Sequence, residues 1–371
     1  MRESFAIRVG LVLLGEELEA LRDRCVIVEN GVIISISSYE MCPENSIGGR
    51  SVALLPQPGN AHTHSADHAF PEYGLEAELE NLVAPPHGLK HRLLASTPSE
   101  KLIEAITEFY RLAWRNGLGL LIDFREGGGE GCKLAQMSKE SVPDLRVIVL
   151  GRPGPQWPEY CDGLGLASPL GFSKDELRKL IETRRPAMTH VAETFKVRAE
   201  GDLELALEAG FDAIVHGTHL SKEDLELLKE KKVWLIMCPR SNLWHGVGTP
   251  PIAEALKTGL EFALGTDNAS WSLPDVWEEA RAALYVARAQ KEKGERVPLE
   301  ILKAILVNPY KAVRIEPPIV AEGKKAKFVL ALVEGYGVLN ALNVYAALVK
   351  RIGTFNVLAR VDGNRITWLK S

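Results

Sequence analysis

Histidines that follow apolar runs are the residues of this sequence best suited to bind a metal. His62 and His64 form an HxH pair directly after an apolar run that ends at Ala61. In an extended chain, side chains at i and i+2 point to the same face, so both imidazoles can converge on one point. Imidazole is the commonest protein ligand for metal ions near neutral pH. Taken alone, the pair is explained equally well by two ordinary histidines.

Four further polar residues follow later apolar runs. His190 lies near the end of one run, and Glu193 comes three residues after it. His216 is the last residue of a second run, and Asp267 directly follows a third. Each alone has an ordinary explanation, because a strand-end aspartate often caps a helix and a lone histidine is often a packed core residue. Together with the HxH pair they lie at the same end of four predicted strands, which coincidence explains poorly.

The elements that must position these residues alternate along the middle of the chain. The apolar runs predicted as strands are 52–61, 118–124, 146–151, 163–167, 187–191, 213–216, 233–238 and 262–266. The helical patterns are 99–116, 173–184, 201–209, 221–231, 252–258 and 274–291. Eight strands alternating with helices predict an α/β fold, a (β/α)8 TIM barrel whose chemistry lies at the C-terminal strand ends. The alternative, an open doubly wound sheet, lacks its nucleotide fingerprint, since the glycine cluster 127–131 fits none and is expected to be a flexible loop.

Both ends of the chain carry short β-type runs instead. The sequence 362–364 (DGN) between two such runs is a strong hairpin signal. Neither end has enough strands to close a core alone. We therefore expect residues 1–55 and 318–371 to join into one small β-sandwich domain beside a barrel of residues 56–317.

The composition and charge of the chain limit the kinds of binding partner that we expect. The 371 residues include 44 Lys and Arg against 49 Asp and Glu, a net charge of −5 without a basic cluster, so a nucleic-acid polymer is not expected. No run approaches the roughly 20 apolar residues that cross a bilayer, so we expect no membrane partner. The five cysteines lie far apart and form no CxxC pair, which predicts neither a disulfide framework nor a thiolate zinc site. We expect a reducing cytoplasm, a small-molecule substrate and, as the commonest oligomer, a homodimer.

Five motifs in order resemble signatures of the amidohydrolase superfamily. They are similar to its strand 1, 5, 6, 7 and 8 motifs and read 56–64 (PQPGNAHTH), 190–194 (HVAET), 215–220 (VHGTHL), 238–243 (CPRSNL) and 264–268 (LGTDN). Within the superfamily the chain looks like the branch of cytosine deaminases, S-adenosylhomocysteine/methylthioadenosine deaminases and atrazine-type chlorohydrolases. The similarity extends to 308–312 (NPYKA) and so covers nearly the whole chain.

The resemblance implies a role for each matching residue. The expected metal ligands are His62, His64, His190 and Asp267. The expected catalytic residues are Glu193, which shuttles a proton, His216, which orients and polarises the substrate, and Asp267, which accepts the proton of water. His216 is preferred to His219 because the family pattern places the catalytic histidine first in HxxH.

One divalent ion is expected at this site. Three neutral imidazoles and a carboxylate suit Zn²⁺, with Fe²⁺ as second choice, and such an ion lowers the pKa of water from 15.7 towards roughly 7. Relatives with two metals bridge them by a lysine on strand 4, but the run 163–167 contains none. We therefore expect a single metal.

Substrate contacts are predicted from two loops. The segment 84–92 (APPHGLKHR) is rich in hydrogen-bond donors, so Lys90, His91 and Arg92 are candidates for binding a carboxylate or phosphate. The alternative is that Lys90 and Arg92 begin a solvated helix. His245 follows strand 7 and is either a substrate contact or an exposed loop histidine.

The pattern as a whole predicts a metal-dependent hydrolase that acts on a C–N bond. Hydrolytic deamination of a purine- or pyrimidine-like heterocycle is the preferred reaction. The first alternative is a dechlorinating or ring-opening amidohydrolase, because the same activated water serves all three reactions. The second is a barrel that binds a ligand without catalysis.

Overall fold

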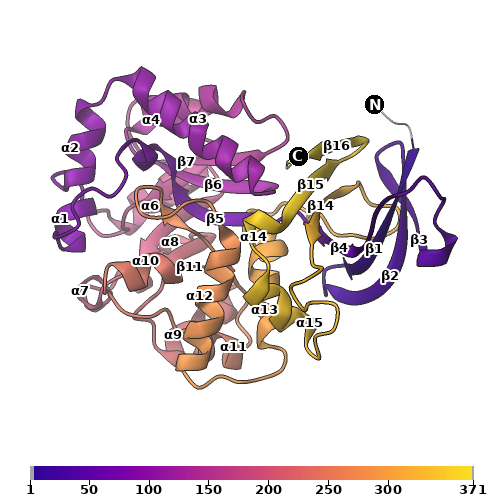
Figure 1. The fold of residues 1–371 in the computed structure, drawn as a ribbon. Coiled ribbons are helices and arrows are strands. Elements are labelled where there is room, and N and C mark those ends of the chain that lie inside the picture. The colour runs from indigo at the N-terminus through magenta and orange to yellow at the C-terminus, as the bar shows by residue number, and fades with distance from the viewer. Residues whose placement is uncertain (1–3, 370–371) are drawn as a thin grey trace.

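The computed structural model describes residues 4–369, and its larger part is a curled parallel sheet surrounded by helices (Figure 1). The strands of this sheet are β5 (Gly59–His64), β6 (Leu120–Arg125), β7 (Arg146–Gly151), β8 (Gly163–Leu166), β9 (Ala187–Val191), β10 (Ala213–His216), β11 (Trp234–Met237), β12 (Phe262–Leu264) and β13 (Asp267–Asn268). They are hydrogen-bonded in the order β12-β11-β10-β9-β8-β7-β6-β5-β13, and every pair is parallel. Parallel strands place all their C-terminal ends at one rim.

The two edges of this sheet meet. β12 and β13 are the edge strands, although only Gly265 and Thr266 separate them in the sequence. Asn60 of β5 stabilises the short connection between β12 and β13, which we call the junction. Its amide nitrogen donates to Thr266 Oγ1 at 2.7 Å, and its side-chain oxygen accepts from Thr266 N at 3.0 Å. A Cβ on Gly265 would lie 2.6–2.9 Å from atoms of His62, so the close approach needs glycine. The fold is the TIM-barrel-like α/β arrangement that the alternating pattern predicted.

Helices cover the outer face of the sheet (Figure 1). They are α1 (Leu79–Val83), α2 (Leu89–Ser96), α3 (Ser99–Arg115), α4 (Gly128–Lys139), α5 (Trp157–Tyr160), α6 (Lys174–Thr183), α7 (Phe195–Ala199), α8 (Asp202–Ala209), α9 (Lys222–Lys231), α10 (Pro239–Trp244), α11 (Ile252–Thr258), α12 (Val276–Ala289), α13 (Val297–Leu306), α14 (Asn308–Ala312) and α15 (Val344–Arg351), with 3-10 turns η1 (Tyr39–Met41), η2 (Ser65–Ala69) and η3 (Thr354–Asn356). Ser173 and Ser221 begin α6 and α9 with capping boxes, which explains why these starts are readable from the sequence. No helix within residues 4–369 combines the length and apolar character needed to span a membrane.

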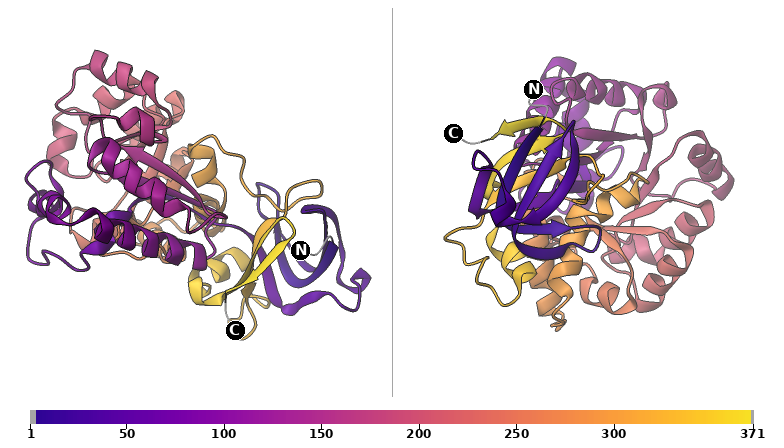
Figure 2. Two further views of the ribbon diagram at one scale, coloured as in Figure 1. Left: turned by 90° about the horizontal axis from the view of Figure 1, so that it is seen from above. Right: turned by 90° about the vertical axis from the view of Figure 1, so that its right-hand side faces the viewer.

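Strands from both chain ends share a second sheet. Its strands are β1 (Ser4–Leu14), β2 (Glu19–Glu29), β3 (Val32–Ser38), β4 (Ile47–Pro56), β14 (Lys327–Leu332), β15 (Val357–Asp362) and β16 (Arg365–Trp368), in the order β16-β15-β14-β4-β1-β2-β3. Figure 2 shows this sheet to one side of the barrel, with N-terminal strands beside C-terminal ones. The expected β-sandwich is not confirmed, because β4 pairs with β1 on one side and β14 on the other and so joins the two ends edge to edge. Residues 1–3 and 370–371 of the predicted small domain lie outside the described residues.

The run 52–61, which we expected to be one barrel strand, is divided between the two sheets. β4 ends at Pro56 in the small sheet, and β5 begins at Gly59 in the barrel. The physical reason is the intervening Gln57-Pro58, since proline has no N–H for a sheet ladder. Hydrophobic continuity alone does not reveal such a change of sheet.

The expectation of no disulfides was wrong. Cys25 pairs with Cys42, and Cys132 pairs with Cys161, with Cα atoms 5.3 Å and 5.2 Å apart. The sequence spacing gave no sign of this because the pairing depends on packing: α4 contacts α5, which brings Cys132 and Cys161 together. Cys238 is free and buried. The argument from cysteines for a reducing cytoplasm therefore loses its basis.

The glycine cluster 127–131 is also different from the flexible loop that we expected. α4 begins at Gly128, within the cluster. The glycines serve close packing, since a Cβ on Gly131 would lie 1.7 Å from the carbonyl oxygen of Glu126. The cluster thus holds α4 tightly against the end of β6.

Candidate metal centre and active site

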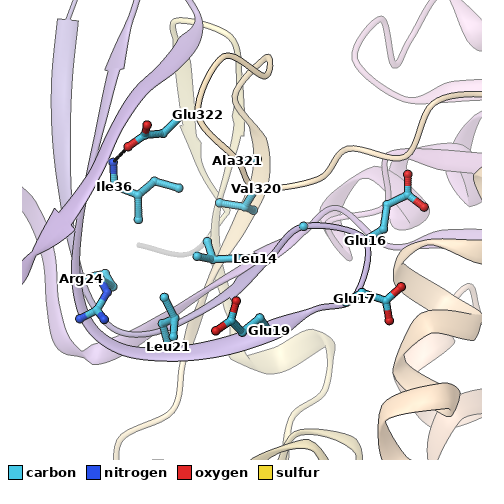
Figure 3. Close-up of a pocket in the computed structure, with 11 residues that line it drawn as sticks. Leu14, Glu16, Glu17, Glu19, Leu21, Arg24, Ile36, Val320, Ala321 and Glu322 are labelled. Atoms are coloured by element: carbon cyan, nitrogen blue, oxygen red, sulfur yellow. Dashed lines mark hydrogen bonds between the residues drawn. The ribbon is translucent and has the colours of Figure 1, made fainter.

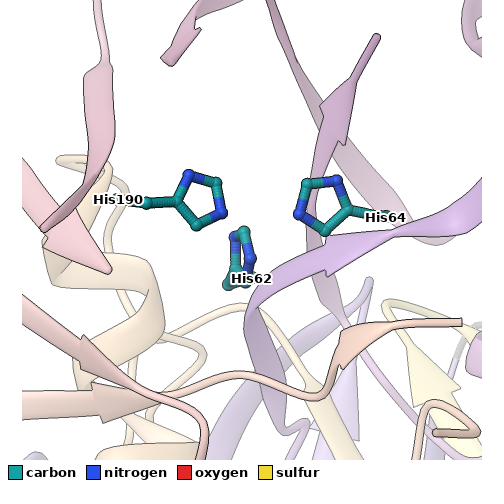
Figure 4. Close-up of side chains that lie close together, drawn as sticks. All are labelled: His62, His64 and His190. Carbon is teal, nitrogen blue, oxygen red and sulfur yellow. The ribbon is translucent and has the colours of Figure 1, made fainter. Parts of the chain in front are cut away.

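The strand ends bring the predicted ligands to one rim of the barrel. β5 carries His62 and His64, β9 carries His190, and Asp267 begins β13. The exposed fractions of His62, His64 and Asp267 are 0%, 4% and 7%. Figure 4 shows the rings of His62, His64 and His190 turned toward one another. Residues that are 205 positions apart in the sequence are therefore neighbours in the barrel.

The expected ligand atoms fall into two close clusters that share His62. One ligand atom from each of His62, His64 and His190 lies within 4.8 Å of the others, and the same holds for His62, His216 and Asp267. Asp267 Oδ1 lies 3.2 Å from His62 Nε2 and 3.6 Å from His64 Nε2. Three imidazoles and a carboxylate form the donor set of a divalent transition-metal site.

Protonation states agree with a metal centre. Burial lowers the pKa of His62 and His190 and lowers the pKa of His64 to about 3, so all three rings are neutral at neutral pH. Burial alone would raise the pKa of Asp267, but the hydrogen bond from His62 and the nearby histidines hold this pKa well below its usual range. Neutral imidazoles and an ionised carboxylate are the forms that bind metal. The residues present therefore fit a divalent ion.

Backbone conformation at the site is unusual. Ala192, His216 and Asp267 have φ values of 52°, 73° and 60°, although none is glycine. Left-handed conformations of such residues store strain and cluster at functional sites. These three residues lie directly after β9, at the end of β10 and at the start of β13.

Glu193 and His216 form a pair beside the ligands. His216 Nε2 lies 3.5 Å from Glu193 Oε1. Asn242 Nδ2 lies 3.2 Å from His216 Nδ1 and donates to it, so the ring carries its proton on Nε2, the atom that faces Glu193. Burial raises the pKa of Glu193, and His216 opposes this shift. A carboxyl group with a raised pKa beside a cavity is suited to hold and deliver a proton.

His219 lies elsewhere. Its Nε2 is 2.7 Å from the carbonyl oxygen of Val247, and its ring packs edge-on against Phe195. His216, by contrast, borders the cavity above the ligands. The geometry therefore favours His216 of the HxxH pair for a role in the site.

A cavity of about 640 Å³ opens above the ligands. Its lining includes His64, His190, Glu193, His216 and Asp267, and also Lys90, His245 and Trp271. Apolar side chains from the helix α1 region and the loop after β8 form much of the remaining wall, namely Leu79, Val83, Ala84, Pro85, Leu166, Ala167, Leu170 and Phe172. The cavity is thus polar at the ligands and apolar farther out. Cavities of this volume take ligands of nucleoside size.

The four predicted substrate residues have different surroundings. Lys90 lines the cavity but is 2% exposed, and its Nζ lies 2.9 Å from Asp67 Oδ2 and 2.8 Å from Glu126 Oε1. His245 also lines the cavity, with its ring centroid 4.5 Å from that of Trp271.

His91 and Arg92 do not line this cavity. His91 Nε2 lies 3.0 Å from the carbonyl oxygen of Val83, and Arg92 is exposed on α2. The alternative of a solvated helix therefore describes Arg92, whereas Lys90 on the same helix is buried.

Sequence reasoning missed several residues around the ligands. Glu126 contacts His64, Ser241 donates from its hydroxyl to Asp267 Oδ2, and Asn242 contacts His216. Glu126 had a usable signal, because it directly follows β6 at the same rim as the ligands.

A second hollow lies on the small sheet, away from the ligands. It measures about 520 Å³ and is lined by apolar side chains such as Leu14 and Ile36 together with glutamates (Figure 3). Two of the glutamates are engaged, since Glu322 accepts from Ile36 N at 2.8 Å and Glu17 Oε2 lies 2.6 Å from Lys303 Nζ. None of the predicted site residues lines this hollow.

Comparison with known proteins decides the family. The model of the amidohydrolase family matches residues 58–359. The chain belongs to the amidohydrolase family. This confirms the resemblance that the strand-end motifs indicated, and with it the expectation of a metal-dependent hydrolase of C–N bonds.

Two relatives match this amidohydrolase over most of its length. A putative aminohydrolase of Methanothermobacter thermautotrophicus is 32% identical over 81% of this chain and 84% of its own. A 5-methylthioadenosine/S-adenosylhomocysteine deaminase of Pyrococcus furiosus is 36% identical over 87% of this chain and 85% of its own.

Solved structures share the fold of this amidohydrolase. An adenosine deaminase from Xanthomonas campestris with bound zinc has a TM-score of 0.78 at 17% identity, covering 98% of this chain and 92% of that one. A triazine hydrolase from Arthrobacter aurescens has a TM-score of 0.79 at 13% identity, covering 98% and 94%. At these identities the likeness concerns the fold alone.

Proposed function

We propose that this amidohydrolase is a hydrolytic deaminase of a purine- or pyrimidine-like heterocycle that uses one zinc ion. The observation that carries the proposal is the convergence of His62, His64, His190 and Asp267 beneath a cavity that Glu193 borders. Relatives named as deaminase and aminohydrolase support the choice of reaction. The same four residues are the proposed metal ligands.

The chemistry that the ion supplies when bound is the activation of water, whose pKa falls from 15.7 towards about 7. The protein residues move the protons. We infer that Asp267 takes the proton of the attacking water and that Glu193 gives its own to a ring nitrogen of the substrate. The carbon gains a hydroxyl group, and we infer that the proton held by Asp267 then passes to the amino nitrogen. The bond between the carbon and this nitrogen breaks, ammonia leaves, and Glu193 regains its proton from the hydroxyl group as the carbonyl forms.

The remaining residues orient the reacting groups. Ser241 donates to Asp267 Oδ2 and so directs the other oxygen of this carboxylate toward the histidines. Asn242 fixes the ring of His216, whose Nε2–H faces the cavity side of Glu193. We propose that His245 and Lys90 face the substrate, with Trp271 packed behind His245.

An ammonia-release screen tests the reaction. Zinc-loaded protein is incubated with nucleobases, nucleosides, pterins and triazines, and ammonia and chloride are both measured. Ammonia release from at least one heterocycle, abolished in the metal-free protein, is the expected result. Release of chloride without ammonia from a chlorinated triazine would instead favour the dechlorinating alternative, and ring opening without ammonia would favour an amidase.

A further inference from the structure

Glu126 is a buried carboxylate beside the proposed metal ligands to which the reaction above gives no role. It follows β6 directly and is 6% exposed. Its Oε1 lies 3.0 Å from His64 Nδ1, 2.8 Å from Lys90 Nζ and 3.1 Å from a guanidinium nitrogen of Arg152. Two cationic groups and an imidazole nitrogen therefore meet at one oxygen atom, the His64 contact being a close approach without hydrogen-bond geometry.

This oxygen constrains the ring of His64. An ionised carboxylate offers only lone pairs, so a proton on the nitrogen that faces it, Nδ1, is the favoured arrangement of the neutral ring. The lone pair is then left on Nε2, which lies 3.6 Å from Asp267 Oδ1 at the ligand cluster. Partners of this kind fix the tautomer of a metal-binding histidine and raise its basicity.

His190 provides a parallel within the same site. Its Nδ1 lies 2.7 Å from the carbonyl oxygen of Leu166, which likewise only accepts, so Nε2 is free to face the metal. Glu126 lies against Nδ1 of His64 as the carbonyl oxygen of Leu166 lies against Nδ1 of His190. It differs in bringing a negative charge.

Lys90 and Arg152 stabilise the negative charge of Glu126. Lys90 Nζ and a guanidinium nitrogen of Arg152 lie 2.8 Å and 3.1 Å from Glu126 Oε1, so two cations stabilise the ionised carboxylate. Lys90 in turn forms ion pairs with both Asp67 and Glu126. Lys90 therefore contacts Glu126 as well as lining the cavity.

We propose that Glu126 is the positioning residue of His64, and that Lys90 and Arg152 hold its carboxylate in place. The proposal rests on the proposed function, because it takes His64 to be a metal ligand.

Zinc affinity tests the proposal directly. Metal-free wild type, Glu126→Gln and Asp212→Asn proteins are titrated with Zn²⁺ against a chromophoric chelator. Glu126→Gln keeps the shape but loses the charge, and we expect its zinc affinity to fall about 10- to 100-fold. Thermal unfolding of each metal-free protein checks that it is folded.

Asp212 is the matched control. It precedes β10 at the opposite end of the barrel, its side chain is 7% exposed, and it pairs with Arg185 and Arg314. Asp212→Asn also removes a largely buried, arginine-paired charge, so it is expected to lower stability while leaving zinc affinity within about threefold of wild type.

A measurement on the wild type does not depend on any variant folding. Nitrogen-15 spectra of histidine-labelled, zinc-loaded protein are expected to show His64 protonated on Nδ1. An unprotonated Nδ1, or a folded Glu126→Gln protein with zinc affinity within threefold of wild type, would overturn the positioning role. A wild type that fails to bind zinc would instead overturn the proposed function itself.

Discussion

Glu193 combines a raised pKa, a place on the cavity wall and a neighbouring histidine. We predict that Glu193→Gln retains its metal and loses about 10²- to 10⁴-fold in kcat, because an amide cannot deliver the proton. The measurements are ammonia release and the metal content of the purified variant. Glu200→Gln, which changes an exposed carboxylate seven positions along, should behave as wild type. An unaltered kcat in Glu193→Gln would remove Glu193 from the proposed mechanism.

The buried ring of His64 predicts a pH dependence of the metal-free protein. Burial lowers the pKa of His64 from 6.5 to about 3, so the unfolded chain binds this proton at a higher pH than the folded protein does. The contribution to stability is therefore complete above pH 6.5 and is lost as the pH falls towards 3. Urea unfolding of metal-free protein at several pH values should show the free energy of unfolding falling in this window. The fall should be shallower in His64→Gln, and equal slopes would contradict the expectation.

At the residue scale, the convergence of the proposed ligands could be predicted because each of them follows an apolar run at the same strand end. His62, His190 and Asp267 need only the barrel rule to be brought together. The same rule places Glu126 at this rim, because it directly follows β6, but it does not give the residue its partners. Its partners come from β5, α2 and the loop after β7, and no spacing in the sequence encodes that convergence.

Among the elements, the junction between β12 and β13 controls the site most directly. Gly265 lies against the backbone of His62, where an added Cβ would meet atoms at 2.6–2.9 Å. We predict that Gly265→Ala lowers the free energy of unfolding by about 1–3 kcal/mol through overpacking and weakens zinc binding by displacing His62. Denaturant unfolding and zinc titration measure the two effects.

Gly49→Ala serves as the control for this substitution. Gly49 lies in β4 of the small sheet, and a Cβ there would meet nothing closer than Ser51 Oγ at 3.8 Å. It should bind zinc as wild type does. Wild-type zinc affinity in Gly265→Ala would show that the junction tolerates the extra atom.

Element positions were predictable where periodicity and caps agree. The expected helix 173–184 is α6 because Ser173 and Glu176 form a capping box visible in the sequence. The run 52–61 was misassigned because β4 and β5 are both apolar and only Gln57-Pro58 separates them. Such a change of sheet is decided by long-range pairing of β4 with β1 and β14.

On the scale of the whole molecule, the two disulfides predict sensitivity to reductant. They close loops with sequence separations of 17 and 29 residues, and loop-closure entropy gives about 3 kcal/mol for each. We expect the Tm of the protein to fall after full reduction, and Cys132→Ser to reproduce part of that fall. Calorimetry with and without reductant measures it. A Tm unaffected by reduction, with free thiols verified, would contradict the expectation.

The division into a unit of residues 56–317 and a small unit from both chain ends remains our proposal, as does a homodimer. Sedimentation of the purified protein tests the second. The family match across residues 58–359 extends into the C-terminal strands of the small sheet. Only β14 and the first residues of β15 in the small sheet therefore lie within the family match.

The junction between β12 and β13 also has a consequence for synthesis on the ribosome. A nascent chain that has emerged only as far as residue 260 already contains the three proposed histidine ligands, but it lacks β13 and the proposed aspartate ligand. The strand that closes the sheet and the aspartate therefore arrive together. We expect tight zinc binding only once both are in place.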